Sequence, residues 1–386
     1  MEKEIIPIET LREKIDTIDK DIVRLFKERM DVASLVADYK REKGLPVHDP
    51  VRERQLLTKI AALAGNEFSD YSKVLYSTIL SLSKSYQRAL LGVESDVYDK
   101  ITRALDETEK IFPETAKVAC QGVEGAYSGI AAGRLFSLPD ITYCPSFDSV
   151  FDALDKGECE YGVLPLENST AGSVVKIYDL MMHHNFNIVR SVRIKIDHCL
   201  LAKRGTSLQN IKEVFSHEQA INQCSQFIKE HPEIKFTPVA NTAMASLAVA
   251  NSERNDVAAL SSRHCAELYG LQNLISSVQD QGNNYTRFIC ISKKLEIYPG
   301  ADKTTIMAAT GDTPGALYQL LSLFFAHGIN ITKLESRPMP TRDFEYIFYL
   351  DLDVSIYSPK LKTVLSELER YSGEFRYLGS YTESVG

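Results

Sequence analysis

The stretch YGVLPLENS, residues 161–169, is apolar over its first six residues and then turns polar. Short apolar runs separated by helical stretches recur downstream, as at 257–260. This alternation is typical of a mostly parallel, doubly wound α/β domain, and about 180 residues suit two lobes around a cleft. Because strand ends line the ligand crevice of open α/β sheets, Glu167 and Asn168 become candidates for a site. A helix N-cap at Asn168 or Ser169 is the alternative interpretation.

The segment before this domain is predicted to be all-helical. Residues 8–43 contain neither glycine nor proline, and their apolar side chains recur at helical spacing. Thr10 as N-cap, with Glu13 three residues later, predicts a capping box, and the stretch GLPVHDP that follows the segment ends the helix. Two more helices are predicted over roughly 50–64 and 68–91. The first helix would be about 50 Å long, too long for its companions to cover, so we expect a homodimer.

A third pattern begins at Thr304. A strand, the turn GDTPGAL and an amphipathic helix ending at Gly328 are followed by two strands, a helix from Pro359 and a last strand near 376–381. This β-α-β-β-α-β order is ferredoxin-like. The sequence therefore predicts an all-helical domain at 1–92, a linker at 93–115, an α/β domain at 116–297 and an α+β domain at 303–386.

Composition excludes several classes of function. The 386 residues carry 44 Lys and Arg against 52 Asp and Glu, a net charge of −8, so neither a nucleic acid nor a membrane is an expected partner. The start lacks the pattern of a signal peptide, and the seven cysteines form no CxxC pair, which favours a cytoplasmic location. The eight histidines show no HxxxH or HExxH spacing, so we expect no metal and no cofactor.

Two cations of the first helix could form an anion site. Arg29 and Lys40 lie eleven residues apart, which puts them about 20° from eclipsed on one helix face. Their arms could bracket a small anionic ligand. A face that simply projects Lys and Arg into water is the alternative.

Several motifs of the helical segment occur together in one enzyme family. They are Leu11-Arg12, Glu28-Arg29, Lys40, Pro46-Val47, DPVRER at 49–54 and SKSYQ at 83–87. On these residues the segment closely resembles the all-helical chorismate mutases. In that family, arginines hold both carboxylates of chorismate, and a lysine and a glutamine contact its ether oxygen.

The resemblance implies a role for each matching residue. The carboxylates would be held by Arg12 (reaching across the dimer), Arg29 and Arg52, the ether oxygen by Lys40 and Gln87, and the hydroxyl and ring side by Asp49, Glu53 and Ser83. The rearrangement of chorismate to prephenate is unimolecular and needs no nucleophile. It needs a fixed chair-like conformer and stabilised charge on the ether oxygen, which these residue types supply.

The α/β segment resembles prephenate dehydratase. The motifs are PLENS at 165–169, DHCL at 197–200, Ser216-His217 with Gln223-Cys224, and TRF at 286–288. The resemblance implies a two-lobed fold like type 2 periplasmic binding proteins, whose cleft decarboxylates and dehydrates prephenate to phenylpyruvate. Thr286 would donate to the leaving hydroxyl, and the remaining site residues would be Glu167, Asn168, Ser216, Gln223 and Arg287. His198 is interpreted as a strand histidine with satisfied hydrogen bonds.

The C-terminal segment resembles the ACT regulatory domain. Its motifs are GDTPGAL at 311–317 and ESRP at 335–338, although the first alone would indicate an ordinary helix start. The resemblance implies that L-phenylalanine binds as an allosteric effector where two such domains pair, through Gly315, Ala316, Leu317, Glu335, Ser336, Arg337 and Pro338.

Taken together, the three segments predict a bifunctional enzyme of phenylalanine biosynthesis under feedback control. Chorismate and prephenate are its substrates, and a dimer or a tetramer is the expected assembly. Two alternatives stay open. One is a monofunctional dehydratase whose helical domain serves only for dimerisation, and the other is a non-catalytic aromatic amino-acid sensor.

Overall fold

The computed structural model describes residues 6–91, 95–339, 345–371 and 374–386. They form two compact units. One comprises residues 1–99, 310–330 and 359–373, and the other comprises residues 100–309, 331–358 and 374–386.

The first unit is helical. Its elements are α1 (Ile8–Lys43), α2 (Pro50–Leu91), the start of α3 (Asp96–Glu107), α11 (Ala316–Ala326) and α12 (Pro359–Tyr371). Gly44 ends α1 in the left-handed conformation, at φ 64°. Gly65 interrupts α2 at φ 68°, a conformation that favours glycine, so the two predicted helices are confirmed on either side of it.

The start of α1 differs from the prediction. The helix begins at Ile8 after Pro7, which occupies the N-cap position without a side-chain cap, and Leu11 N donates to Pro7 O at 3.2 Å. Thr10 therefore lies inside the first turn, and the predicted capping box is wrong. Proline suits a helix start because its φ, here −54°, is already close to helical and its missing N–H is not needed.

Most of the apolar stripe of α1 stays exposed in the described chain. Ile15, Ile22, Leu25 and Leu35 are 55%, 57%, 54% and 67% exposed. Large apolar faces of this kind mark surfaces for association.

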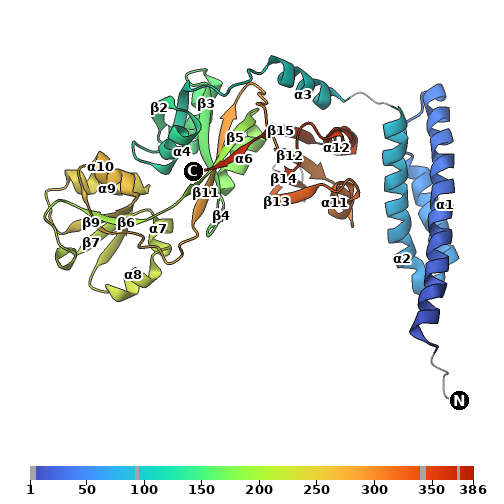
Figure 1. Ribbon diagram of the computed structural model, residues 1–386, viewed down its shortest axis with the longest axis horizontal. Helices are drawn as coiled ribbons and strands as arrows, with labels where there is room; N and C mark the ends of the chain where they lie inside the picture. The colour runs from blue at the N-terminus through green and yellow to red at the C-terminus, as the bar shows by residue number, and fades with distance from the viewer. Residues whose placement is uncertain (1–5, 92–94, 340–344, 372–373) are drawn as a thin grey trace. The chain divides into compact units, whose positions relative to one another are not determined.

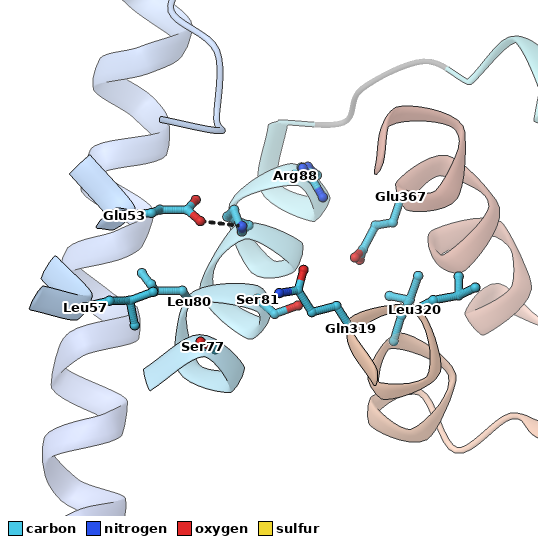
Figure 2. Close-up of a pocket in the computed structure, with 11 residues that line it drawn as sticks. Glu53, Leu57, Ser77, Leu80, Ser81, Arg88, Gln319, Leu320 and Glu367 are labelled. Atoms are coloured by element: carbon cyan, nitrogen blue, oxygen red, sulfur yellow. Dashed lines mark hydrogen bonds and ion pairs between the residues drawn. The ribbon is translucent and has the colours of Figure 1, made fainter. Parts of the chain in front are cut away.

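Helices α11 and α12 pack against α2. Thr78 Oγ1 lies 3.3 Å from Tyr318 OH, and Ser95 Oγ, directly before α3, donates to Glu369 Oε2 at 2.7 Å. A pocket of about 630 Å³ lies between these helices, and Figure 2 shows the residues that line it.

The second unit contains two α/β lobes (Figure 1). The first lobe has a sheet of order β16-β5-β11-β3-β1-β2, with β4 beside β3. Its strands are β1 (Thr115–Gln121), β2 (Leu138–Cys144), β3 (Tyr161–Asn168), β4 (Gly172–Ser173), β5 (Asn187–Lys195), β11 (Tyr285–Ser292) and β16 (Glu383–Val385), and its helices are α4 (Tyr127–Leu135), α5 (Phe147–Asp155) and α6 (Val175–His183).

The second lobe has a sheet of order β10-β6-β9-β7-β8. Its elements are β6 (Cys199–Ala202), β7 (Glu213–Ser216), α7 (Glu218–Asn222), α8 (Ser225–Glu230), β8 (Lys235–Pro238), α9 (Thr242–Asn251), β9 (Val257–Ser261), α10 (Arg263–Leu268) and β10 (Gln272–Ile275). The chain leaves the first lobe after β5 and returns to it as β11.

Both sheets are mixed, which corrects the expectation of mostly parallel strands. β1 runs parallel to β2 and β3, but β11 is antiparallel to both β3 and β5. The return from the second lobe explains this, because β11 enters the first sheet from the opposite end to β3.

A third sheet has the order β13-β14-β12-β15. Its strands are β12 (Lys303–Thr310), β13 (Asn330–Pro338), β14 (Tyr346–Asp353) and β15 (Phe375–Tyr381). With α11 and α12 placed between them along the chain, the predicted β-α-β-β-α-β order is confirmed.

The third sheet shares a core with the first lobe. The rings of Tyr178 on α6 and Tyr349 on β14 meet edge to face, with centroids 5.0 Å apart, and Tyr349 OH donates to Tyr178 O at 2.7 Å. Gly379, at φ 142°, brings β15 against β5 so closely that a Cβ would lie 2.1 Å from Ile188 O. These contacts attach the third sheet firmly to the lobe that carries PLENS and TRF.

Candidate active sites

The corner between α1 and α2 is held by two of the predicted mutase residues. Lys40 Nζ donates to Val47 O at 2.6 Å. Asp49 caps α2, its Oδ1 accepting from Arg52 N at 3.0 Å. The side chains of Arg12 and Arg52 are exposed, and no contact joins Arg12 to the other predicted residues within the described part of the chain.

Three further predicted residues lie on the two helices in partly or fully buried positions. Ser83 and Gln87 are 4% and 8% exposed on one face of α2, with Gln87 Nε2 3.5 Å from Ser83 Oγ. Gln87 Oε1 and Arg29 Nη1 are buried, and neither has a hydrogen-bond partner among the described residues. Buried polar atoms without partners are costly, so these two atoms are suited to a polar ligand.

Glu53 faces Lys84 of its own helix and His48 in the corner before that helix. Its Oε2 accepts from Lys84 Nζ at 3.0 Å, and its Oε1 lies 3.7 Å from His48 Nε2. Glu53 and Lys84 also line the pocket between α2, α11 and α12, in which Figure 2 shows this ion pair as a dashed line. The carboxylate is thus oriented before any ligand arrives.

A cleft of about 1140 Å³, its open mouth included, lies between the two lobes of the second unit. The polar side chains that line it include Gln121, Tyr127, Ser128, Asn168, His198, His217, Gln223, Asn241, Thr242 and Thr286. Asn168, Gln223 and Thr286 were predicted, and the structure brings all three together.

Asn168 is the centre of the hydrogen-bond network in this cleft. Its Oδ1 accepts from the backbone N–H groups of Thr170 and Ala171 at 3.0 and 2.9 Å, which only the oxygen of the amide can do. Its Nδ2 therefore faces Asn284 Oδ1 at 2.7 Å and Thr286 Oγ1 at 2.9 Å. The amide orientation follows from the backbone, and it makes Thr286 an acceptor towards Asn168.

Gln223 connects the second lobe to this network. Its Nε2 donates to Thr170 Oγ1 at 2.9 Å, and its Oε1 accepts from Asn284 Nδ2 at 3.0 Å. His198 Nε2 lies 3.0 Å from the same Oε1, so Nε2 carries the proton. Burial lowers the pKa of His198, opposed by the bond to Gln223 and by Asp197. The imidazole is therefore neutral near pH 7.

The strand interpretation of His198 was incomplete. The residue lines the cleft, and its Nδ1 is buried without a hydrogen-bond partner among the described residues. Thr170 and the buried Asn284 were not among the predicted site residues. Their signal was adjacency, because Thr170 directly follows PLENS and Asn284 lies two residues before TRF.

Three predicted residues lie outside the lining of the cleft. Ser216 is fully buried and donates to Leu260 O at 2.7 Å. Glu167 and Arg287 pair with each other across β3 and β11, with Arg287 Nε 2.7 Å from Glu167 Oε1, and neither is among the residues that line the cleft. Successive side chains of a strand point to opposite faces, so these two turn away from their neighbours Asn168 and Thr286. Direct contact of Glu167 or Arg287 with a substrate in the cleft is not supported.

The surroundings of Arg287 keep it charged. Burial disfavours its charge, but the carboxylates of Asp351 and Glu167, together with Tyr381, hold the pKa of Arg287 above its ordinary value. Its Nη2 lies 2.5 Å from Asp351 Oδ2 on the third sheet.

The predicted effector residues lie on two different segments. Gly315 (φ 85°), Ala316 and Leu317 lie at the start of α11 in the first unit, while the segment 335–338 ends β13 in the second unit. Glu335 Oε2 accepts from Ser173 Oγ at 2.5 Å, and Arg337 pairs with Asp179 at 2.8 Å. Ser336 and Pro338 are exposed.

The described ranges contain neither a cluster of metal ligands nor a helix that could cross a membrane. No group of three or more His, Cys, Asp or Glu side chains there could hold a metal ion. None of the helices in those ranges combines the length and apolar character that a bilayer span requires.

Two groups of polar side chains thus stand out, one with buried cationic and amide groups on α1 and α2 and one in the two-lobed α/β cleft. Comparison of sequences assigns each of these parts of the chain to an enzyme family. Residues 11–88 match the family Chorismate mutase type II, and residues 118–296 match the family Prephenate dehydratase. The Bifunctional chorismate mutase/prephenate dehydratase of Escherichia coli K12 is 34% identical over 385 residues, 97% of this chain and 96% of that protein.

Two solved structures resemble the dehydratase part. Prephenate dehydratase from Arthrobacter aurescens in complex with L-Phe has a TM-score of 0.63 at 28% identity, over 69% of this chain and 90% of its own. GqqA, described as a novel type of quorum quenching acylase, has a TM-score of 0.63 at 31% identity, over 69% and 98%. Because these two are described as different enzymes, the shared fold alone does not select an activity.

The Escherichia coli relative, which matches 97% of the chain, does select one. The chain belongs to the bifunctional chorismate mutase/prephenate dehydratase family. Its two activities are those of an isomerase and a carbon–oxygen lyase, which act in sequence in phenylalanine biosynthesis. The predicted resemblances of the helical and α/β segments are confirmed.

Proposed function

We propose that the cleft dehydrates prephenate at Asn168 and Thr286 and that the helical unit binds chorismate around Arg29 and Gln87. L-Phenylalanine controls the enzyme through the segments 315–317 and 335–338. Each part of the proposal has its own structural support.

The observation that carries the dehydratase part is the direction of one hydrogen bond. Asn168 Nδ2 donates to Thr286 Oγ1, so the proton of the threonine hydroxyl is available to the cleft. A prephenate ring hydroxyl beside Thr286 accepts that hydrogen bond while its C–O bond breaks. The ring carboxylate leaves as CO2, its bonding electrons complete the aromatic ring, and the departing hydroxide takes up one proton to become water.

Thr286 stabilises the leaving oxygen in this scheme and does not supply the proton. A threonine hydroxyl is too weak an acid at neutral pH, and the lowered pKa of His198 leaves that residue without a proton to give. The leaving hydroxide is instead neutralised by solvent in the open cleft as the C–O bond breaks, so that no side chain of the cleft gives up a proton. Asn284 Oδ1 accepts from Asn168 Nδ2, and Gln223 bonds to both Asn284 and Thr170, so these two residues orient Asn168 towards Thr286.

The mutase part is supported by the buried atoms without partners. Arg29 Nη1 on α1 supplies a donor for a carboxylate, and the buried side chain of Gln87 on α2 contacts the ether oxygen. Gln87 reaches that oxygen through its Nε2 donor, with Lys40 as the second donor. Asp49, Glu53 and Ser83 then hold the hydroxyl and ring side of chorismate, and Arg52 with Arg12 of a second copy completes the carboxylate site.

We assign that second copy to the exposed stripe of α1. Four large apolar side chains more than half exposed on one helix, Ile15, Ile22, Leu25 and Leu35, are better covered by an identical helix than by water. A homodimer brings Arg12 to the partner's site, and pairing of the C-terminal domains makes a tetramer. All seven cysteines are free and buried, which suits a cytoplasmic location.

The proposal is tested by product analysis of the purified chain supplied with chorismate, with and without L-phenylalanine. Formation of phenylpyruvate that phenylalanine suppresses supports all three parts. Accumulation of prephenate alone would contradict the dehydratase part. Dehydration of added prephenate without turnover of chorismate would reduce the helical unit to a dimerisation module.

A further inference from the structure

The two strands that carry the dehydratase residues have a second face. β3 and β11 are antiparallel neighbours, with Asn168 opposite Thr286 and Glu167 opposite Arg287. Asn168 and Thr286, called the cleft pair below, line the cleft. Because successive side chains of a strand alternate, Glu167 and Arg287 point to the other side. The contacts that fix Glu167 and Arg287 therefore also fix the backbone that carries the cleft pair.

Arg287 lies at the centre of a buried group of charges on that face. Its side chain is 7% exposed, and its Nη2 donates to Asp351 Oδ2 at 2.5 Å. Its Nε lies 2.7 Å from Glu167 Oε1, but the N–H does not point at that oxygen, so this contact is an ion pair without hydrogen-bond geometry. Lys333 Nζ lies 2.5 Å from Glu167 Oε2. Two cations and two carboxylates therefore balance one another.

Half of this charge group belongs to the third sheet. Asp351 lies on β14, and its other oxygen accepts from Thr305 Oγ1 on β12 at 2.6 Å. Lys333 lies on β13 and also donates to Ser173 Oγ at 2.8 Å, and that hydroxyl donates in turn to Glu335 at 2.5 Å. These contacts form an unbroken path from the segment 335–338 to the strand neighbours of the cleft pair.

We propose that Lys333 and Asp351, side chains of the third sheet, are positioning residues for the dehydratase reaction. They hold Glu167 and Arg287 in place and thereby fix the ends of β3 and β11 that carry the cleft pair. Separating a buried charge from its partner is strongly disfavoured, so the third sheet does not shift without the strand ends shifting with it. The proposal rests on the proposed dehydratase function and adds the residues by which the third sheet acts on it.

The same contacts supply the coupling that feedback control needs. Glu335 belongs to the segment to which we assign phenylalanine binding. A ligand that binds Glu335 changes the hydrogen bonds that Ser173 and Lys333 make. The position of the Lys333 ammonium group beside Glu167 then changes as well. Allosteric control requires a part of the structure whose contacts differ between two states. We assign that role to this charge group.

The first test is the dehydratase kinetics of Lys333→Met, which keeps the apolar stem and removes the charge. We expect kcat to fall about tenfold or more with KM within about twofold, because a displaced strand end misplaces the cleft pair without removing a substrate contact. Lys333→Arg restores the charge and should recover most of kcat. The matched control is Lys303→Met, a lysine of the same sheet that pairs with Asp353 at 3.5 Å. The thermal unfolding transition of each variant, compared with that of the wild type, reports that the second unit is folded.

The second test asks whether Lys333 acts through Glu167. In a Glu167→Gln background, Lys333→Met should lower kcat by less than about a further twofold, since the route is already interrupted. At equal phenylalanine occupancy, measured by calorimetry, Lys333→Met should also be inhibited by a smaller factor than the wild type.

The proposal is overturned if Lys333→Met dehydrates prephenate at the wild-type rate, or if its loss is undiminished in the Glu167→Gln background. A wild-type chain that does not turn prephenate over at all would instead overturn the proposed dehydratase function, and this proposal with it.

Discussion

Replacement of Thr286 by valine tests the dehydratase site most directly. Valine keeps the shape of the side chain and removes the hydroxyl whose oxygen accepts from Asn168 Nδ2 at 2.9 Å. If that hydroxyl stabilises the leaving oxygen, kcat for prephenate should fall by about 10²–10³, equivalent to roughly 3–4 kcal/mol of transition-state stabilisation. KM should change much less, because the interaction strengthens only as the C–O bond breaks.

The same replacement should leave the fold intact. Asn168 Nδ2 retains two acceptors, Asn284 Oδ1 at 2.7 Å and Tyr285 O at 3.2 Å, so no buried donor is left without a partner. The free energy of unfolding should therefore change by no more than about 1 kcal/mol. This change is smaller than the expected loss in activation free energy, so the two effects can be separated.

The assay is phenylpyruvate formation from added prephenate, with the urea unfolding midpoint of the same preparation as the check that the substituted unit is folded. Thr286→Ser returns the hydroxyl and should recover most of the activity. Thr142→Val makes the same exchange at an exposed position of β2 and should leave kcat unchanged. A Thr286→Val enzyme that keeps more than about one third of the wild-type kcat would refute the role of the hydroxyl.

Four further outcomes follow from the described contacts. Arg29→Met removes a buried donor without a protein partner and should lower mutase kcat/KM at least about 100-fold while dehydratase turnover persists, which coupled and separate assays compare. Leu35→Glu charges the exposed stripe of α1 and should shift the chain towards monomer in light scattering. Because burial lowers the pKa of His198, the unfolded chain binds more protons than the folded chain below about pH 6.5, so stability should fall as pH falls through that range. His198→Gln should lessen that fall in urea midpoints compared at pH 7.5 and pH 5.5. Arg337→Met removes the ion pair with Asp179 and should weaken inhibition by phenylalanine, and an unchanged inhibition curve would contradict the assignment of that segment.

Elements with strong local signals were predictable from the sequence. The helix over residues 8–43 follows from a run without glycine or proline and from its apolar spacing, and it ends at Gly44 because that residue adopts φ 64°. The interruption of α2 at Gly65 has the same local cause. The start of α1 was not predictable in this way. Thr10 and Glu13 fit the pattern of a capping box, but the helix begins before them, at Ile8.

Pairings between distant strands were harder to predict. The position of β11 between β3 and β5 depends on the chain's return from the second lobe, and nothing in residues 285–292 reveals its direction. The short strand β16 was missed because its three residues pair with β5 only in the folded chain. These residues form a strand because they pair with residues about 190 positions earlier in the chain. The periodicity of a local segment cannot reveal such a pairing.

The candidate site shows the same limit at the scale of single residues. PLENS and TRF both contribute residues to the lining of the cleft, but a motif read along the chain treats Glu167 and Asn168 as members of one site. The pleat of the strands separates them, so Asn168 and Thr286 line the cleft while Glu167 and Arg287 bind the third sheet. Each motif therefore serves two tasks at adjacent positions. A replacement at Glu167 or Arg287 that lowers dehydratase activity is accordingly no sign of contact with prephenate, because the loss can arise from the opposite face of the strands.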